Sequence, residues 1–368
     1  MDLDSLLSDV SAGHRLSEEE GLFLLSTRGR DIFKVCDTAD MMREEKAGPA
    51  VTYVRNQNLH LSNICKNLCG FCAFGKNATD PGAFCDDDET IRRKALLAAR
   101  RKVSEICLLS GVHPDFDTDR YVKIISVVKQ AAPEIHIHAF SPDEVNHAAT
   151  QSGITTSEVI TAFRDAGLDT LQGTAAEILV DSVRGIMCPA KVSTKLWVKI
   201  IKEAHRLGVP STATIMYGSC ETPGDRIAHL SILRTIQDET GGFTELVPLS
   251  YLHRNTRLYL EKKAPAGATG REDILLVAVS RLFLDNFRNI QASWGKLGVK
   301  LGQLALLAGA NDLGGTMFSD DVSAKAGAGD AEYLDPAEME RLAVDIGRVL
   351  SRRLTDYTLL DAQSPVHE

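Results

Sequence analysis

Short apolar runs rich in β-forming residues alternate with longer amphipathic stretches, about eight times after residue 50. The runs predict strands at 58–62, 105–109, 135–139, 170–173, 211–216, 244–248, 291–294 and 305–308. The amphipathic stretches predict helices at 88–102, 118–131, 156–166, 194–207, 223–239 and 272–286. Repeated βα units favour parallel strands, and about eight units favour a closed barrel. The predicted fold class is therefore α/β, a (β/α)8 TIM-type barrel with an N-terminal helical extension.

The first fifty residues have a helical pattern instead. Ser17 followed by Glu20 has the form of a capping box, and Leu22, Phe33 and Val35 are among the apolar positions. We expect this segment to form a lid or a packing layer ahead of the main fold. The predicted domains are the helical extension, residues 1–50, and a barrel with C-terminal helices, residues 51–368.

Polar or glycine-rich sequences follow nearly every predicted strand. They lie at 65–72, 110–114, 138–142, 173–177, 217–221 and 309–316. In a barrel of parallel strands such loops meet at the carboxyl ends of the strands, where active sites are built. Six motifs that are far apart in the sequence are therefore predicted to form one site.

The composition and charge of the chain indicate which kinds of partner and which cellular compartment to expect. The chain has 368 residues, of which 44% are hydrophobic and 25% charged, enough apolar material for a globular core. The formal net charge is −9 and the basic residues are scattered, so nucleic acid is a poor candidate partner. The N-terminus lacks the pattern of a signal peptide, and no apolar run has the length of a membrane span. We expect a cytoplasmic protein with reduced thiols and no membrane partner.

Three cysteines carry the strongest chemical signal. Cys65, Cys69 and Cys72 have the spacing C-x3-C-x2-C. Thiolates suit iron–sulfur clusters, and three of them can hold three irons of a four-iron cluster while the fourth iron stays open to a substrate. A structural zinc site would need a fourth close ligand, and the next cysteine is Cys85. A disulfide framework is disfavoured because eight cysteines are sparse in this chain. Spacing alone leaves zinc and inert core thiols open.

The cysteine motif, Phe71 before its third cysteine and the βα alternation resemble the radical S-adenosylmethionine (radical SAM) superfamily. More narrowly, residues from about 53 to 357 resemble the CofH family, the tyrosine-using subunits of 8-hydroxy-5-deazaflavin (Fo) synthase. The matching stretches are 65–74, 135–142, 173–181, 240–245 and 309–316. Two positions depart from the family pattern, since Ser110 stands where glycine is expected and Ser219 where histidine is expected. Both are predicted to line the pocket, so they bear on substrate identity.

The resemblance implies that Cys65, Cys69 and Cys72 ligate a 4Fe-4S cluster whose open iron binds S-adenosylmethionine. It implies a radical SAM transferase that cleaves L-tyrosine and adds the 4-hydroxybenzyl group to 5-amino-6-(D-ribitylamino)uracil in Fo coenzyme biosynthesis. The implied partners are these substrates, an external reductant and the second Fo synthase subunit (CofG). The alternatives are an aminofutalosine-type synthase of menaquinone biosynthesis, a paralogue with an altered substrate, and a cluster- or zinc-binding scaffold without catalysis.

Phe71, Gly111 and Glu177 are predicted to bind the cofactor. The resemblance implies that Phe71 lies near the adenine, and its alternative role is to pack the cysteine loop against the barrel. Gly111 would let the backbone approach a ligand closely, although a glycine after a strand is often only a turn. Glu177 would accept hydrogen bonds from the ribose or amino group, or else serve the dipole of a following helix.

His138, Tyr217 and Glu221 are the predicted catalytic residues, and Asn311 and Asp312 are added to the cofactor-binding set. His138 lies near the loop end of its predicted strand, where a satisfied core histidine is the alternative. Tyr217 and Glu221 follow the fifth predicted strand, and Asn311 and Asp312 follow the eighth. A substrate with many donors and acceptors needs such a polar rim, although Asn311 and Asp312 could equally cap a turn.

Overall fold

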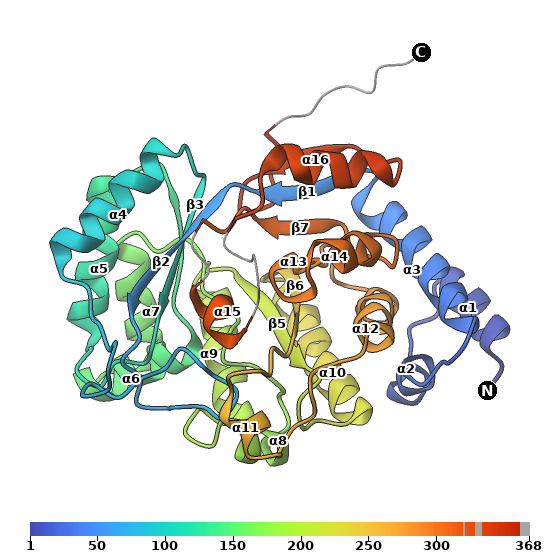
Figure 1. The fold of residues 1–368 in the computed structure, drawn as a ribbon, viewed down its shortest axis with the longest axis horizontal. Coiled ribbons are helices and arrows are strands. Elements are labelled where there is room, and N and C mark those ends of the chain that lie inside the picture. Colours follow the sequence, from blue (N-terminus) through green and yellow to red (C-terminus); the bar gives the residue numbers. More distant parts are fainter. Residues whose placement is uncertain (319–320, 328–332, 361–368) are drawn as a thin grey trace.

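Parallel strands and helices alternate through the structure, a computed structural model that describes residues 1–318, 321–327 and 333–360 (Figure 1). The strands are β1 (Val51–Val54), β2 (Asn56–Ser62), β3 (Glu105–Ser110), β4 (His136–His138), β5 (Ser211–Tyr217), β6 (Phe243–Ser250), β7 (Asp312–Gly315) and β8 (Leu350–Arg353). They form three sheets, in the orders β7-β1-β8, β2-β3-β4 and β5-β6. Every pairing between these strands is parallel. The predicted α/β class is confirmed.

Single parallel bridges connect the three sheets. The bridged pairs are His138 with Thr170, Leu171 with Ser211, Leu246 with Ile290, Gln291 with Asp312, and Gln57 with Phe318. They link β4 to β5, β6 to β7, and β2 to the segment after β7. The segments 170–173 and 291–294, predicted as strands, therefore contribute bridges in place of full strands.

Helices connect and cover the sheets. They are α1 (Leu3–Ser11), α2 (Glu18–Leu25), α3 (Asp31–Ala47), α4 (Asp88–Arg100), α5 (Thr118–Ala131), α6 (Pro142–Ser152), α7 (Thr156–Asp165), α8 (Asp181–Met187), α9 (Thr194–Arg206), α10 (Pro223–Thr240), α11 (Arg257–Leu260), α12 (Gly270–Phe283), α13 (Trp294–Leu297), α14 (Val299–Leu306), α15 (Asp321–Ala326) and α16 (Pro336–Asp345). Among the described residues, no helix is long and apolar enough to cross a membrane.

One predicted strand is wrong. The apolar run at 305–308 continues α14, in which Gly302, Ala305 and Leu306 are buried at helical spacing. A short apolar run has no periodicity that separates a buried strand from a buried helix. The strand that closes this part of the chain is β7, which begins at Asp312.

The first three helices lie on one flank of the molecule, beside α10 and α12 (Figure 1). The capping box predicted at Ser17 and Glu20 is present, since the Ser17 side chain accepts from the Glu20 N–H and Glu20 accepts from the Ser17 N–H. Gly21 of α2 lies so close to Ile227 of α10 and Phe283 of α12 that an added Cβ would be 3.0 Å from each. These helices therefore form a packing layer on the outer helices.

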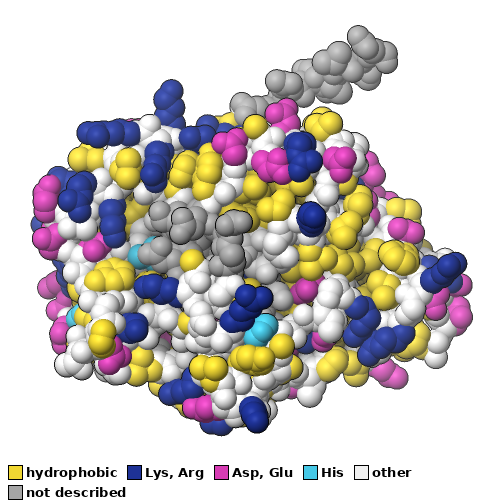
Figure 2. Space-filling view, viewed as in Figure 1, with side chains coloured by type: hydrophobic (Ala, Val, Ile, Leu, Met, Phe, Trp, Pro, Cys, Tyr) yellow, Lys and Arg dark blue, Asp and Glu magenta, His cyan; other side chains and the backbone are white. Residues whose placement is uncertain are grey.

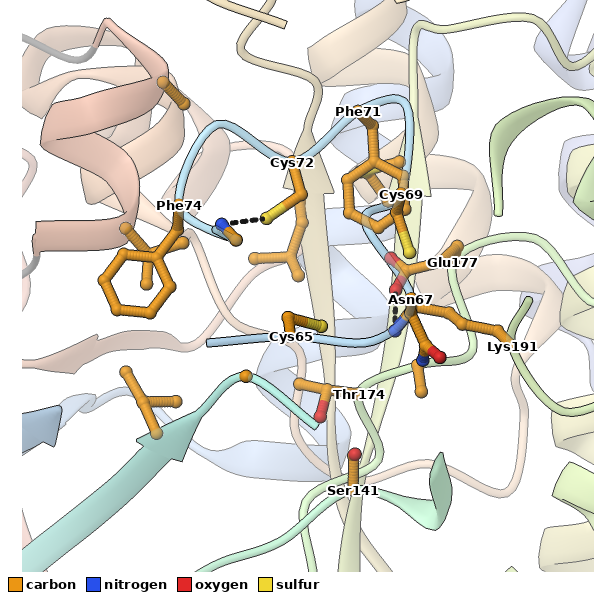
Figure 3. Close-up of a pocket in the computed structure, with 18 of the residues that line it drawn as sticks. Cys65, Asn67, Cys69, Phe71, Cys72, Phe74, Ser141, Thr174, Glu177 and Lys191 are labelled. Carbon is orange, nitrogen blue, oxygen red and sulfur yellow. Dashed lines mark hydrogen bonds and ion pairs between the residues drawn. The ribbon is translucent and has the colours of Figure 1, made fainter. Parts of the chain in front are cut away.

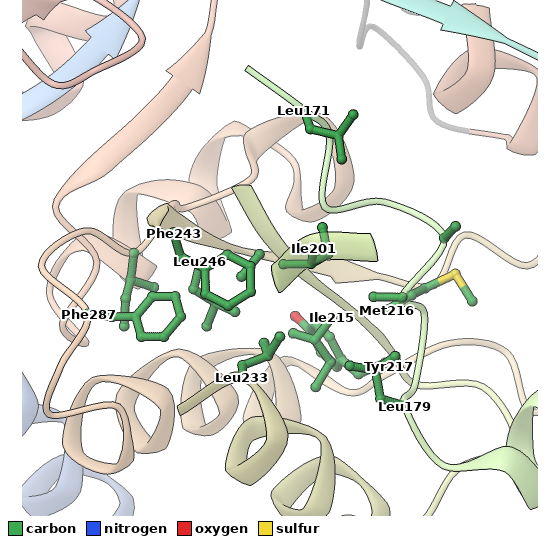
Figure 4. Close-up of a cluster of buried hydrophobic side chains, with 14 of the residues drawn as sticks. Leu171, Leu179, Ile201, Ile215, Met216, Tyr217, Leu233, Phe243, Leu246 and Phe287 are labelled. Carbon is green, nitrogen blue, oxygen red and sulfur yellow. The ribbon is translucent and has the colours of Figure 1, made fainter. Parts of the chain in front are cut away.

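The core between β5, β6 and their covering helices is fully apolar at its centre. Ile215, Leu246, Ile201 and Leu233 have no exposed surface, and Figure 4 shows these side chains facing one another. Burying a side chain of this size stabilises the fold by about 1.5–3 kcal/mol. On the outer face in Figure 2, acidic and basic side chains occur together on both flanks, as expected for a solvated surface.

Buried charges gather at the amino ends of β3, β6 and β7, where they meet the last residue of β8 and the segment after it. The Arg353 guanidinium of β8 donates to Asp312 Oδ1 at 3.0 Å and lies 3.7 Å from Glu245 Oε2, which also accepts from the Tyr357 hydroxyl at 2.8 Å. We call Glu105, Glu245, Asp312, Arg353 and Tyr357 the amino-end cluster. Burial raises the pKa of Glu245 to about 7, although Arg353 opposes this shift. The cluster ties β8 to three other strands.

Candidate active site

A cavity of about 280 Å³ opens at the carboxyl ends of the strands, as the loop motifs predict. Its lining includes Gly111 directly after β3, Met216 near the end of β5 and Ser250 at the end of β6. Residues 1–50 are all described, and none of them lines this cavity. Of the two roles predicted for that segment, the lid is therefore wrong.

The loop that carries the three cysteines leaves β2 and is held closed by its own backbone. The Cys65 N–H donates to the Lys76 carbonyl at 3.0 Å, and the Lys76 N–H donates to the Asn63 carbonyl at 2.8 Å. On the other side, the Leu258 N–H of α11 donates to the Gly70 carbonyl at 2.9 Å. A Cβ on Gly70 would lie 2.8 Å from the Leu258 side chain, so only glycine fits there. The loop is therefore held on both sides.

Cys65, Cys69 and Cys72 all border the cavity (Figure 3). Cys69 is buried, and burial raises the pKa of its thiol above the ordinary value. Among the described residues, no three His, Cys, Asp or Glu side chains are gathered into a finished metal-binding group. Three soft thiols on one loop beside one cavity nevertheless fit, in donor type and number, a cluster that keeps one iron free.

A buried lysine stands beside the cysteine loop. Lys191 Nζ lies 3.2 Å from Glu177 Oε1, 3.3 Å from Asp143 Oδ2 and 5.9 Å from the centre of the Phe71 ring. Burial favours the neutral amine, but Glu177 and Asp143 outweigh it and raise the pKa of Lys191 well above its ordinary value. Lys191 and Glu177 both line the cavity (Figure 3).

Glu177 adopts a left-handed backbone conformation with φ of 46°. For a residue other than glycine this conformation costs about 1 kcal/mol or more, and it is common at ligand sites. The Glu177 carbonyl accepts from the Met216 N–H of β5 at 2.9 Å, which holds the bend against the strand. The strained backbone directs the carboxylate to the cavity and to Lys191.

Gly111 has a packing reason to be glycine. A Cβ there would lie 2.4 Å from the Ile64 carbonyl oxygen and 2.8 Å from the Cys65 Cβ. The end of β3 therefore touches the cysteine loop directly, and any side chain at this position would push the loop outward. Gly111 also lines the cavity, so its packing role and its predicted role beside a ligand are compatible.

Comparison with known proteins places the chain in a family. The radical SAM superfamily model matches residues 59–233, and the model of the CofH/MqnC C-terminal region matches residues 240–347. A protein of Methanosphaerula palustris is 58% identical over 97% of this chain and 98% of its own length. The chain belongs to the CofH family of radical SAM enzymes. The predicted family and the prediction of an enzyme are confirmed.

Other members of the CofH family are similar over most of their length. A Methanocaldococcus jannaschii protein is 43% identical over 94% of this chain and 97% of its own length. Both relatives are named 5-amino-6-(D-ribitylamino)uracil–L-tyrosine 4-hydroxyphenyl transferase. Among solved structures, methylornithine synthase (PylB) matches with a TM-score of 0.74 and 20% identity, covering 94% of this chain and 97% of its own. The hydrogenase maturase HydG also gives 0.74, with 16% identity over 95% of this chain and 76% of its own. At these identities the likeness concerns the fold alone.

In this CofH-family chain, His138 and Tyr217 lie outside the cavity lining. His138 Nδ1 is hydrogen bonded to Thr170 Oγ1 at 2.8 Å, and burial lowers the pKa of the imidazole to about 4. The Tyr217 hydroxyl donates to Asp273 at 2.8 Å and has no exposed surface. Both side chains have satisfied partners within the described fold.

Glu221 also lies outside the cavity lining and organises the turn before α10. Its carboxylate accepts from the Gly218 and Ser219 N–H groups at 2.6 and 2.9 Å, and pairs with Arg226 at 2.8 Å. Ser219, predicted to line the pocket, donates its hydroxyl to the same carboxylate and does not border the cavity. Ser110, the other departure from the family pattern, does border it.

Asn311 and Asp312 lie at the opposite ends of the strands from the cavity, because Asp312 is the first residue of β7. Asn311 Oδ1 accepts from the Arg281 guanidinium and from the Ile290 N–H, both at 2.9 Å. Asp312 pairs with Arg353 in the amino-end cluster. The shifted strand boundary, β7 in place of 305–308, explains why a motif expected after a strand instead begins one.

Asn67, Glu144 and Lys191 line the cavity but were not among the predicted site residues. Asp143 lies behind them, in contact with Lys191 and Asn67. Only Glu144 had a signal, because Ser141 followed by Glu144 directly after a predicted strand has the form of a capping box. That box is present, with Glu144 Oε2 accepting from the Ser141 N–H at 2.7 Å. Burial raises the pKa of Glu144 to about 7.

Proposed function

We propose that the protein cleaves L-tyrosine and transfers its 4-hydroxybenzyl group to 5-amino-6-(D-ribitylamino)uracil, as a radical SAM transferase of Fo biosynthesis. The observation that carries the proposal is that Cys65, Cys69 and Cys72 share one loop and border one cavity. The names of the relatives support the substrates, since a transferase of this name is 58% identical over 97% of the chain.

Cys65, Cys69 and Cys72 would hold a 4Fe-4S cluster, and the adjoining cavity would take S-adenosylmethionine. When bound, these groups supply one-electron reduction and hydrogen abstraction, which protein side chains do not provide. The chain's own part is to bind and orient the reactants and to exclude water from them.

Different side chains of the cavity lining would bind polar groups of the reactants and exclude water from them. Phe71 offers an apolar ring, Glu177 accepts hydrogen bonds from hydroxyl or ammonium groups, and Lys191 holds the Glu177 carboxylate in place through a 3.2 Å ion pair. Apolar side chains that exclude water are Val112, Met216, Leu249, Leu252 and, from α15, Val322 and Ala326. His138, Tyr217, Glu221, Asn311 and Asp312 would support the strands and turns behind this surface, because each already has buried partners.

The same proposal extends to the architecture. The three sheets and their bridges would form one closed (β/α)8 barrel, in the order β2, β3, β4, 170–171, β5, β6, 290–291 and β7. The pairing of Gln57 with Phe318 would return the ring to β2. Residues 1–50 would be the helical extension and residues 51–368 the barrel with C-terminal helices, of which 319–320, 328–332 and 361–368 lie outside the described residues.

The chemistry implies its partners. A hydroxybenzyl adduct of the uracil still needs ring closure, so we include a functional partnership with the second Fo synthase subunit (CofG). An external reductant must supply the electron. Exposed and half-buried free thiols, such as Cys85 and Cys220, suit the reducing conditions of the cytoplasm.

The test is an anaerobic assay of the reconstituted protein with S-adenosylmethionine, a strong reductant, L-tyrosine and 5-amino-6-(D-ribitylamino)uracil. Mass spectrometry should detect 5′-deoxyadenosine together with the hydroxybenzyl adduct. Deoxyadenosine without the adduct would overturn the substrate pair and redirect the search to an aminofutalosine-type reaction. Absence of deoxyadenosine would overturn the radical chemistry itself.

A further inference from the structure

Two buried oxygen atoms at the cavity have no hydrogen-bond partner among the described residues. They are Oδ1 of Asn67 and Oε1 of Glu144. The two residues are 8% and 4% exposed, and both line the cavity. A buried acceptor without a donor costs about 1–3 kcal/mol, so such atoms in a native protein call for an explanation. Two of them at one cavity indicate a ligand that brings donors.

The hydrogen bonds of Asn67 and Glu144 determine which of their side-chain atoms stay without a partner. The Asn67 Nδ2 group donates to Asp143 Oδ2 at 3.1 Å, which leaves the amide oxygen as the free end of the side chain. Glu144 Oε2 accepts from the N–H and the hydroxyl of Ser141, at 2.7 and 2.8 Å. The capping box therefore holds one carboxylate oxygen of Glu144 and leaves the other without a donor.

The charges around these atoms select the kind of donor. Asp143, Glu144 and Glu177 contribute three carboxyl groups, and Lys191 contributes one ammonium that already bridges Asp143 and Glu177. With Glu144 ionised the surplus is negative, and both unsatisfied atoms are acceptors. Burial favours the protonated form of Glu144, and a cation beside Oε1 favours the ionised form. A primary ammonium group carries a positive charge and three N–H donors, so it complements both properties at once. A ligand hydroxyl would bring one donor and no charge.

We propose that Asn67 and Glu144, backed by Asp143 and Glu177, form a subsite for the primary ammonium of an α-amino acid. The inference rests on the proposed function, which supplies two ligands with this group, L-tyrosine and the methionine half of S-adenosylmethionine. Lys191 acts as a positioning residue, because its bridges hold Asp143 and Glu177 in place. The shared chemistry is the ammonium, and the experiment identifies which ligand brings it.

The experiment measures binding without turnover. Anaerobically reconstituted holoenzyme, kept free of reductant, is titrated with L-tyrosine and with its analogue 3-(4-hydroxyphenyl)propanoate, which lacks the ammonium. S-adenosylmethionine is compared in the same way with 5′-methylthioadenosine, which lacks the amino acid. Glu144→Gln should raise the Kd of at least one ammonium ligand about tenfold or more, the usual effect of losing a charged hydrogen bond. The Kd of its truncated analogue should change less than about twofold.

A matched control is available on α7. Glu158 closes a capping box of the same kind, accepting from the Thr155 N–H at 2.8 Å, but it is exposed and does not line the cavity. Glu158→Gln should leave every Kd unchanged. Asn67→Leu is the second variant and should repeat the ligand selectivity of Glu144→Gln.

Each outcome of the binding experiment either assigns the subsite to one ligand or overturns it. A selective loss for L-tyrosine assigns the subsite to the substrate, and a selective loss for S-adenosylmethionine assigns it to the cofactor. Equal weakening of a ligand and its truncated analogue, or no change in either variant, overturns the subsite while the proposed function stands. If the wild-type holoenzyme binds neither ammonium ligand, the proposed function fails together with the subsite.

Discussion

Two groups of buried charges lie at opposite ends of the same strands, and they differ in completeness. In the amino-end cluster, both oxygens of Asp312 accept hydrogen bonds, from Arg353 and from its other neighbours. Both oxygens of Glu105 also have donors. At the cavity, Glu144 and Asn67 each keep one oxygen without a partner. Burial and charge alone therefore do not mark a binding site, whereas unpaired acceptors beside a cavity do.

The largest expected effect is a loss of activity without a loss of the fold. Replacing Cys65, Cys69 and Cys72 together with Ala should abolish 5′-deoxyadenosine formation, because the proposed cluster loses its thiolate ligands. The fold should persist, since the strands are tied at their other ends by the amino-end cluster. Iron content, product analysis and circular dichroism check these outcomes. An unfolded variant would contradict the division and give the cysteine loop a structural role as well.

The next largest effect is a loss of stability when the amino-end cluster is disrupted. Arg353→Ala should lower the free energy of unfolding by about 3–5 kcal/mol, because it leaves Asp312 buried without its cation. Urea denaturation measures the loss, and the folded fraction should still bind S-adenosylmethionine. Arg341→Ala is the control, since Arg341 pairs with Glu338 on the surface, and it should lower the free energy of unfolding far less than Arg353→Ala. A loss of similar size in both variants would show that the amino-end cluster stabilises the fold no more than the surface pair of Arg341 and Glu338 does.

A smaller effect depends on pH. Because burial raises the pKa of Glu144 from 4.5 to about 7, the folded state holds a proton that the unfolded state releases between these values. The Glu144 contribution to stability is therefore most favourable below about pH 4.5 and declines as pH rises to about 7. Glu144→Gln should gain about 1–3 kcal/mol relative to wild type between pH 4.5 and pH 8.

Urea denaturation at the two pH values measures this gain. Glu158→Gln provides the opposite sign, because a hydrogen bond from the Thr155 backbone lowers the pKa of Glu158. That carboxylate contributes stability above its unfolded pKa, so its replacement should cost stability at pH 8 and not at low pH. If the difference between Glu144→Gln and wild type were the same at both pH values, Glu144 would not be a strained buried carboxyl.

The smallest effect concerns a residue predicted as catalytic. Tyr217→Phe should lower the free energy of unfolding by about 1–2 kcal/mol, because the buried Asp273 loses its hydroxyl donor. Product formation per folded protein should stay close to the wild-type rate. A collapse of the rate without a loss of stability would restore Tyr217 to the reacting centre.

The predictions that succeeded rest on local chemistry. The α/β class, the capping box at Ser17 and the alternation of strands and helices each depend on a few neighbouring residues. The position of the cavity followed from a general property of parallel strands, whose carboxyl ends share one side. Cys65, Phe71, Gly111 and Glu177 border the cavity because they lie in the loops that follow β2, β3 and the bridged segment 170–171.

The contacts that the sequence does not reveal are made between residues that are distant in the chain. Asn311 and Asp312 look like loop residues until Arg281 and Arg353 are seen to bind them, and no local pattern announces those arginines. Lys191 lies in a connecting segment with no motif, and only the fold brings Glu177 and Asp143 to it. A polar residue near a strand end can therefore be predicted from sequence, but not which end of the strands its partners occupy.

The pairing of β8 with β1 also sets an order of events during synthesis. β1 emerges from the ribosome early, yet the edge that Leu350–Arg353 covers stays open until nearly the whole chain is made. At about 5–20 residues per second, that wait lasts on the order of 15–60 seconds. A chain that stops short of Arg353 would leave the carboxylates of Asp312 and Glu245 without their cation. A chain without β8 therefore keeps an unpaired edge of β1, whose free N–H and C=O groups can pair with another chain.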